Sequence, residues 1–373
     1  MKKKLLIFLG FLILGIALFV SVIMKTGLDT IWLNLRQFSF LNFLFFLLLS
    51  TLNFGLYTLR WDIILRHIHA PGEAKGDDNS HTPAHASALH SNSHVGTASP
   101  HDSAEKSVHQ KVPFTRLFLH RMSGFALSYL TPSAQTGGEP LRILMLQHEG
   151  IPSHTAVTSV IIDKALEFAA LFVFIGVGIT LALIDGSLPA NTQIIFGVIL
   201  VVLLSIIAWF YYSSVKDIGF FSSILRFTHL TRFKRFKKME EKLIEVEKQM
   251  AAFYKNHLKV FLFLIFISLI ISAFLLLEHY LVARFMGVRL TFFQTFLAST
   301  IPYLAYIVPI PGGLGLLESG HAAIFALLGV NINAFVLVFI IRMRDMVFVL
   351  VGLIHASKQG VAMLKKAFKE NAG

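Results

Sequence analysis

The stretch IVPIPGGLGLLESG, residues 307–320, interrupts a run that is otherwise apolar enough to cross a lipid bilayer. It contains two prolines, four glycines and the carboxylate of Glu318. Non-helical backbone leaves N–H and C=O groups unpaired. Within the hydrocarbon core, such backbone therefore occurs only where it is buried in protein or lines a polar cavity. The stretch therefore predicts a broken helical segment inside a membrane protein, with Glu318 facing a polar interior.

The composition of the whole chain supports an all-α polytopic membrane protein. Of the 373 residues, 55% are hydrophobic and 14% are charged, and 36 are Phe. A helix needs about 20 apolar residues to span the hydrocarbon core. Two further apolar runs, 114–131 and 291–308, end in Pro/Gly breaks. The six full spans that we predict are residues 5–24, 40–59, 153–184, 191–212, 258–283 and 331–355.

The positive charge of the chain gathers between these spans. The formal net charge is +12, and clustered Lys and Arg next to spans mark the cytoplasmic side. All of these clusters lie on the same side of the membrane under two conditions. The six spans must cross in alternating directions, and each of the two broken runs must return to the side from which it enters. We therefore expect a multi-pass protein of the cell (inner) membrane, with both termini cytoplasmic and no nucleic-acid partner. The clusters are Lys2–Lys4, Arg60 with Arg66, Arg226–Lys259 and Lys358–Lys369.

Several kinds of chemistry find no support in the sequence. The run at 5–24 is too long for a signal peptide and lacks a small-x-small cleavage site, so we interpret it as a retained anchor. The chain has no cysteine, which excludes thiol nucleophiles, disulfides and cysteine metal sites. A Walker motif, a nucleophile elbow and a metal-ligand helix are all missing from the sequence. We therefore predict neither an enzyme nor a cofactor.

Composition divides the chain into segments. The His-rich stretch 70–112 has almost no large apolar side chains, so we expect a disordered cytoplasmic insertion without a specific metal site. The basic segment 213–257 predicts either an amphipathic helix or helix pair on the cytoplasmic surface, or an ordinary positive-inside loop. The divisions are 1–69 (two spans), 70–112 (insertion), 113–184 (first hairpin and charged span), 185–357 (second half) and 358–373 (basic tail).

The second half resembles the first at an offset of 179 residues. Pro132 then falls on Pro311, Glu139 on Glu318, and Asp163 on Arg342; Gly150 likewise falls on Gly329. Each half has two spans, a Pro/Gly-broken hairpin and one charged span. The hairpins, 114–149 and 291–329, enter from opposite sides, as in the inverted repeats of secondary transporters. The backbone of the breaks depends on Pro132, Gly137, Gly138, Pro311, Gly312, Gly313 and Gly315.

Charged residues near the bilayer centre are the candidate substrate-binding groups. Asp163 lies about 15 Å into its span at 1.5 Å per residue, and it shares a helical face with Glu167. Arg342 is central in its own span and is spaced to pair with Asp345, while Arg344 points elsewhere. Charges at this depth are expected to pair or to face water. The candidates are Glu139, Arg142, Asp163, Lys164, Glu167, Glu318, Arg342, Arg344 and Asp345.

Two interpretations of these charges remain open. In one, Asp163 or Glu167 pairs with Arg342 or Arg344 and only locks the halves together. In the other, a polar cavity receives a zwitterionic or phosphate-bearing headgroup, with Arg342 and Arg344 on the phosphate and carboxylates on an amine. Other polar residues in the spans are expected to have no such role. Glu278, Arg60 and Trp61 are expected to be interfacial anchors, and His279, His321 and His355 to be isolated.

Four motifs resemble the membrane domain of lysylphosphatidylglycerol synthases, a flippase-like family. They are LRWDIIL (59–65), PSAQTGGEPLR (132–142), TSVIIDKALEF (158–168) and PIPGGLGLLE (309–318). The resemblance covers essentially all of the chain except the insertion, and it implies lipid transport or handling rather than aminoacylation of lipid by this chain. By motif position it implies roles for Glu139, Arg142, Asp163, Lys164, Gly312, Gly313 and Glu318.

The function that we predict is translocation of a phospholipid, or another anionic or zwitterionic lipid, between leaflets. A separate lipid-modifying enzyme is a possible partner. Two alternatives stay open: a membrane enzyme acting on lipid-linked or polyprenyl-phosphate sugars, and an ion-coupled small-solute transporter. The first would need a sizeable soluble segment with a metal or nucleotide site, and the sequence offers only the insertion and the basic segment.

Overall fold

All regular elements of the described residues are helices. In the computed structural model, two predicted segments lie outside the described residues: the first span, except Met24, and the His-rich insertion, except Val112. Four described helices are long and apolar enough to cross a membrane: Phe40–His67, Ser153–Ile184, Gln193–Val215 and Leu258–Phe285. These helices indicate a multi-pass membrane protein. The structure describes residues 24, 38–68, 112–133, 135–185, 190–216, 218–220, 222–223 and 234–371.

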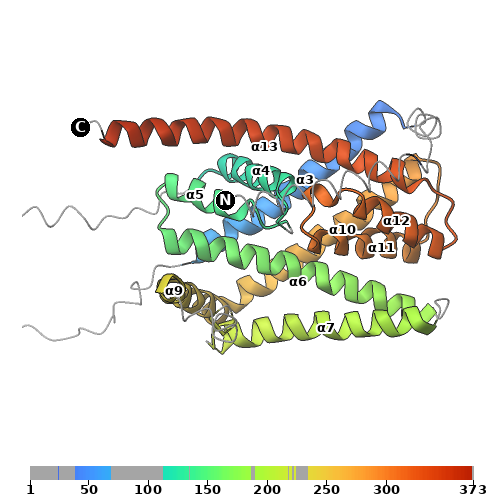
Figure 1. The fold of residues 1–373 in the computed structure, drawn as a ribbon, viewed down its shortest axis with the longest axis horizontal. Coiled ribbons are helices and arrows are strands. Elements are labelled where there is room, and N and C mark those ends of the chain that lie inside the picture. Colours follow the sequence, from blue (N-terminus) through green and yellow to red (C-terminus); the bar gives the residue numbers. More distant parts are fainter. Residues whose placement is uncertain are drawn as a thin grey trace, which may run out of the picture.

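The helices form one bundle in which distant segments of the chain lie side by side (Figure 1). The short helices α4 and α5 lie between the long helices α13 and α6, with α4 packed along α13. On the other side of the bundle, α11 packs against α6, and α10 packs against α3. In order, the elements are α3 (Phe40–His67), α4 (Phe114–Leu130), α5 (Glu139–His148), α6 (Ser153–Asp185), α7 (Ala190–Val215), α9 (Lys234–Asn256), α10 (Leu258–Phe285), α11 (Phe292–Thr300), the 3₁₀ turns η2 (Ile301–Ile307) and η3 (Pro311–Gly313), α12 (Leu316–Leu327) and α13 (Ala334–Asn371).

The contact between α4 and α13 depends on a glycine. The hydroxyl of Ser123 donates to the carbonyl of Gly352 at 2.9 Å. A Cβ at Gly352 would lie 2.2 Å from the carbonyl oxygen of Met122. Small residues let helix backbones approach this closely in membrane proteins, where van der Waals packing holds helices together. Gly352 therefore sets the distance between two helices that come from opposite ends of the chain.

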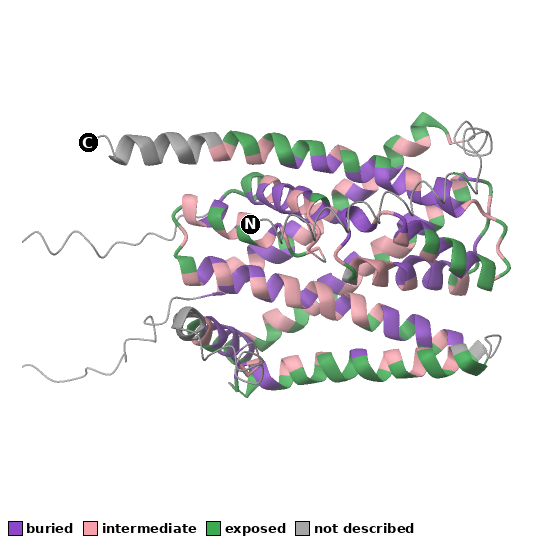
Figure 2. Cartoon of the chain, in the orientation of Figure 1, coloured by how far each residue is buried: buried purple, intermediate pink, exposed green. Residues whose placement is uncertain are grey.

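Large apolar side chains cover the outside of the bundle. Figure 2 shows α7 exposed along most of its length, and Ile194, Val198, Val201 and Trp209 are among its exposed residues. Soluble proteins rarely expose a continuous apolar face of this kind. The face is suited to lipid acyl chains.

The basic segment contains a helix whose apolar side faces the protein. In α9, Val246, Met250 and Phe253 are buried and belong to one apolar cluster with Ile162 of α6 and Leu264 of α10. The prediction of an amphipathic helix is confirmed for Lys234–Asn256. Side chains of α6 and α10 cover the apolar residues Val246, Met250 and Phe253 of this helix. Residues 224–233 lie outside the described part of the chain.

Both predicted breaks interrupt helices. The first separates α4 from α5, and within it Gln135 has a φ of 60°, a left-handed conformation that is uncommon for a residue with a side chain. A Cβ at Gly138 would lie 1.8 Å from the carbonyl oxygen of Gly124, so only glycine fits there. At the second break Gly312 and Gly315 have φ values of 56° and 77°. The glycines thus allow both the tight reversals and the close packing against α4.

We expect Gly352→Ala to destabilise the protein. The added methyl group would push α4 away from α13, and overpacking of this kind costs about 1–3 kcal/mol. The measurement is the thermal unfolding midpoint of the detergent-purified protein, which should fall by several degrees. Gly360→Ala is the matched control on the same helix, because nothing lies within 4 Å of its added Cβ. Equal midpoints for the two variants would contradict the close approach.

Candidate functional site

A single carboxylate organises the charged residues of the first half. Asp163 of α6 is fully buried and accepts from Arg60 Nε at 2.9 Å, Arg121 Nη1 at 2.6 Å and Arg142 Nη2 at 2.8 Å. The three guanidinium groups come from α3, α4 and α5. Arg60 also donates to the backbone carbonyl of Asp163 at 3.0 Å. Asp163 therefore holds four helices together by charge-assisted hydrogen bonds.

Further ion pairs extend this group toward the centre of the bundle. Arg142 donates to Glu139 at 2.8 Å and Arg121 donates to Glu167 at 3.1 Å. Lys164 lies 2.9 Å from Glu167 and 3.3 Å from Glu139. We call these residues the basic cluster, because its four cations outnumber its three carboxylates. Its members are Arg60, Arg121, Arg142, Lys164, Glu139, Asp163 and Glu167.

Aromatic rings cover the three guanidinium groups of this cluster, with Arg60 5.2 Å from the centre of the Tyr57 ring. Arg121 lies 4.5 Å from the centre of the Tyr57 ring, and Arg142 lies 4.0 Å from the ring of Trp61. A cation over an aromatic face is attracted by the ring quadrupole, more strongly where water is excluded. The rings therefore help to keep the arginines charged and oriented in a buried setting.

A second ionic group lies between α3, α10 and α13. Arg344 donates to Glu278 at 2.7 Å and its Nε lies 3.0 Å from Asp345. Ser50 Oγ donates to the other oxygen of Glu278 at 2.8 Å. We call Ser50, Glu278, Arg344 and Asp345 the acidic cluster, because two carboxylates share one guanidinium.

A third pair holds the second break in place. Arg342 Nε donates to Glu318 at 2.7 Å, and its Nη1 donates to the carbonyl of Gly312 at 2.8 Å and to Tyr129 Oη at 3.0 Å. The second oxygen of Glu318 accepts from the backbone N–H of Gly315 at 2.9 Å. The pair thus satisfies backbone groups that the broken helix leaves free.

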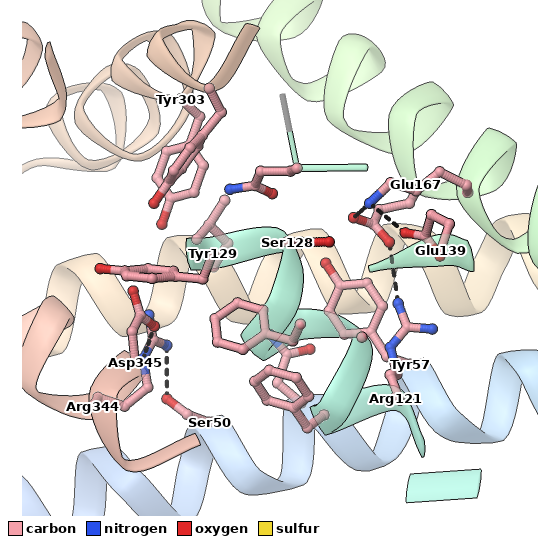
Figure 3. Close-up of a pocket in the computed structure, with 18 of the residues that line it drawn as sticks. Ser50, Tyr57, Arg121, Ser128, Tyr129, Glu139, Glu167, Tyr303, Arg344 and Asp345 are labelled. Carbon is pink, nitrogen blue, oxygen red and sulfur yellow. Dashed lines mark hydrogen bonds and ion pairs between the residues drawn. The ribbon is translucent and has the colours of Figure 1, made fainter. Parts of the chain in front are cut away.

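The basic and acidic clusters face a common cavity of about 160 Å³. Figure 3 shows Arg121, Glu139 and Glu167 on one side of it, and Ser50, Arg344 and Asp345 on the other. Tyrosines and phenylalanines lie between them: Phe54 and Tyr57 from α3, Phe125 and Tyr129 from α4, and Tyr303 and Tyr306 from η2. Both halves of the chain contribute to the lining. The arrangement can hold a small polar group that bears charge, surrounded by a bundle with an apolar outside.

The structure brings most of the sequence candidates to this cavity. Glu139, Arg142, Lys164, Glu167, Arg344 and Asp345 line it. Asp163, Glu318 and Arg342 are not among its lining residues; they are buried and bonded to neighbouring arginine, carboxylate or backbone groups. Their contacts make them supports for the lining groups.

Several lining residues were missed by the sequence analysis. Tyr57, Arg121 and Gln135 line the cavity, and none of them was a candidate. Arg121 is the only Arg or Lys between Arg116 and the break at Pro132, so its depth in an apolar run was a usable signal. Tyr57 carries no such signal, because tyrosines are also common at membrane interfaces.

Three expectations about charged residues are wrong. Arg60, Trp61 and Glu278 are buried inside the bundle, so they are not interfacial anchors. Asp163 pairs within its own half, so the interpretation that it pairs with Arg342 or Arg344 fails. Arg344, rather than Arg342, contacts Asp345. The first two errors arose because the sequence does not identify the facing helix, and the third because Arg344 contacts its neighbour on α13.

The three histidines that were expected to be isolated, His279, His321 and His355, each lie beside another histidine. His279 and His321 stack, with Nε2 atoms 3.4 Å apart. His120 Nδ1 lies 3.1 Å from His355 Nε2 and joins α4 to α13. Within the described residues, no group of three or more His, Asp or Glu side chains is placed to hold a metal ion.

Comparison with known proteins places the chain among membrane proteins. A family model described as the lysylphosphatidylglycerol synthase TM region matches residues 7–352. UPF0104 membrane protein PH1989 of Pyrococcus horikoshii is 26% identical over 243 residues, which are 61% of this chain and 71% of the relative. A UPF0104 membrane protein of Methanothermobacter thermautotrophicus is 26% identical over 228 residues, 58% of this chain and 66% of the relative. No solved structure gives a significant match.

We expect Asp163→Asn to destabilise the fold strongly. The substitution leaves Arg60, Arg121 and Arg142 without their shared counter-charge, and breaking a buried ion pair costs about 3–5 kcal/mol. The measurement is the unfolding midpoint in detergent. Asp62→Asn is the control, because Asp62, although itself buried, pairs with the half-exposed Arg66, so its loss leaves one water-accessible cation rather than three buried ones. A loss for Asp163→Asn no larger than that of the control would contradict the organising role of Asp163.

Proposed function

The chain belongs to the lysylphosphatidylglycerol synthase TM region family, and on that premise we propose that it moves a lipid with a charged headgroup between the two leaflets. The headgroup passes through the central cavity while the acyl chains stay in the bilayer. The observation that carries the proposal is the cavity itself. Charged side chains line it at two ends, although charges at this depth are costly unless they serve binding or pairing.

The number of charges also supports binding. Ion pairs that only stabilised the fold would be expected to balance within each cluster. The basic cluster instead has one surplus cation and the acidic cluster one surplus carboxylate. A headgroup phosphate would be attracted to the surplus cation and to the Arg and Lys donors. The proposed phosphate position is at Arg121, Arg142 and Lys164, because these three line the cavity and Arg342 does not.

The size and surroundings of the site fit a headgroup more closely than a whole lipid. A cavity of about 160 Å³ has room for a small polar group but not for two acyl chains. The apolar outer faces of α3, α7 and α10 offer the chains a hydrocarbon setting. The lipid would thus keep its tails outside the bundle during transfer, and the protein would shield only the headgroup from hydrocarbon.

Alternating exposure of the cavity would follow from two inverted halves. The proposal is that α4 with α5, and α11 with α12, are re-entrant hairpins related by an axis in the membrane plane. Two features support it: α4 packs on α13 while α11 packs on α6, and both hairpins break before a carboxylate, Glu139 or Glu318. Rocking of one half against the other would open the cavity first to one leaflet and then to the other.

Positions of buried charges support the same relation. The helices α3 and α10 both have 28 residues, and Arg60 and Glu278 occupy the same position within them. Arg60 pairs with Asp163 of α6, and Glu278 pairs with Arg344 of α13. The two halves would therefore use similar pairs with the charges exchanged, although Arg344 lies two residues after Arg342, the position that the offset aligns with Asp163.

We expect Lys164→Gln to lower lipid transfer by about tenfold or more while preserving the fold, because a charge-assisted contact to an anion contributes about 1.5–3 kcal/mol. The measurement is dithionite quenching of acyl-labelled fluorescent phospholipids in proteoliposomes. Arg116→Gln is the matched control, since Arg116 is exposed, pairs with Glu149 and lies outside the cavity. No transfer of any lipid class by the wild type, or equal transfer by both variants, would overturn the proposal.

A further inference from the structure

The acidic cluster contains more negative charge than its own partners neutralise. Arg344 contacts Glu278 at 2.7 Å and Asp345 at 3.0 Å, so one guanidinium serves two carboxylates. All three residues line the cavity and are at least nine-tenths buried. In a low-dielectric setting, a surplus carboxylate needs a positive charge close by. Among the described residues, Arg342 is a second cation near Asp345, but Glu318 already pairs with it at 2.7 Å.

A second, independent feature at this end is an unpaired acceptor. Asn53 lies one turn after Ser50 on α3 and lines the same cavity. It is 9% exposed, and its amide oxygen Oδ1 has no hydrogen-bond partner. Buried side-chain oxygens nearly always accept a hydrogen bond, and leaving one unpaired costs free energy. A donor supplied by a ligand would complete it.

The walls of this part of the cavity are aromatic. Tyr303 and Tyr306 come from η2, Phe54 from α3, and Tyr129 from α4. Figure 3 shows Tyr303 and Tyr129 on the same side of the cavity as Arg344 and Asp345. Aromatic faces attract cations, and groups of them recur in sites that bind ammonium ligands. Surplus negative charge, an unpaired acceptor and aromatic walls thus share one location.

We propose that the acidic cluster, with Asn53, binds the protonated primary amine of the lipid headgroup whose phosphate lies at the basic cluster. The proposal rests on the proposed function and narrows its substrate to a zwitterionic lipid with an –NH₃⁺ group. Such a headgroup matches the opposite surplus charges of the two clusters. The ammonium group would provide a second positive charge for Glu278 and Asp345. It would also donate an N–H to Asn53 Oδ1.

Hydrogen bonding separates a primary amine from a quaternary one. A trimethylammonium group carries the same charge and would also suit aromatic walls, but it has no N–H to donate to Asn53 Oδ1. A site built to hydrogen-bond an N–H rejects an analogue without one, because its buried acceptor is left unpaired. A lipid with phosphate but no amine would leave the surplus carboxylate without a counter-charge as well.

The experiment compares three lipids with identical acyl chains and an acyl-chain fluorophore: phosphatidylethanolamine, phosphatidylcholine and phosphatidylglycerol. Each is reconstituted with the full chain in vesicles of otherwise equal composition, and transfer is measured by dithionite quenching. We expect the ethanolamine lipid to be transferred about tenfold faster than the other two, as one unpaired buried polar group costs about 1–3 kcal/mol. Transfer of all three at equal rates would overturn the amine site while leaving lipid transfer intact. Transfer of none would instead overturn the proposed function.

Two variants test whether a preference for the ethanolamine lipid arises from this site. Asp345→Asn removes the surplus charge but keeps a polar side chain of the same size beside Arg344, and Asn53→Leu removes the unpaired acceptor. Both should lower the ratio of ethanolamine to glycerol lipid transfer toward one. Asp62→Asn, outside the cavity, should keep the wild-type ratio. An unchanged ratio in both cavity variants would contradict the assignment.

An inorganic cation could satisfy the same oxygens, so the measurement is repeated with Na⁺ replaced by N-methylglucamine. The amine site predicts equal transfer in both salts. Transfer that requires Na⁺ and shows no preference for the ethanolamine lipid would assign the acidic cluster to a free cation and overturn the proposal.

Discussion

The low dielectric of the bundle interior is the constraint on which the rest of the structure depends, because every buried charge there must find a partner. Asp163 meets this requirement for Arg60, Arg121 and Arg142 at once. Those contacts tie α5 to α3, α4 and α6, so the first break has a fixed place in the bundle. Arg342 does the same for the second break through Glu318 and the carbonyl of Gly312. The buried ion pairs of Asp163 and Arg342 therefore fix the irregular backbone of the two breaks in place.

Imbalance in these ionic groups distinguishes a binding cavity from a structural network. The two clusters together are neutral, but each of them alone is not. The basic cluster includes Lys164 in addition to three arginines, and in the acidic cluster Glu278 and Asp345 share Arg344. The proposed exchange of charges between the halves explains why the two ends of the cavity differ in sign. It also gives a ligand a defined orientation.

Both the helical breaks and the polar interior were predictable from the sequence, since prolines, glycines and charges stand out in apolar runs. Six of the nine candidate residues line the cavity for that reason. Partner choice was not predictable: helical spacing places Asp163 and Glu167 on one face, but it does not say that Arg60 of α3 and Arg121 of α4 face them. Glu278 and Arg60 were taken for interfacial anchors because each lies near the end of an apolar run. The unpaired oxygen of Asn53 becomes apparent only when its neighbours are known.

The central claim is that a lipid headgroup occupies the cavity. The most direct test is whether added lipid protects a single cysteine in the cavity from chemical labelling. The chain contains no cysteine, so Gln135→Cys places one thiol in the lining and Arg116→Cys places one outside it. The account predicts that a charged-headgroup phospholipid added to the detergent-purified protein slows labelling at position 135 by a small polar thiol reagent, with no effect at position 116. Labelling at position 135 that no lipid slows would contradict it.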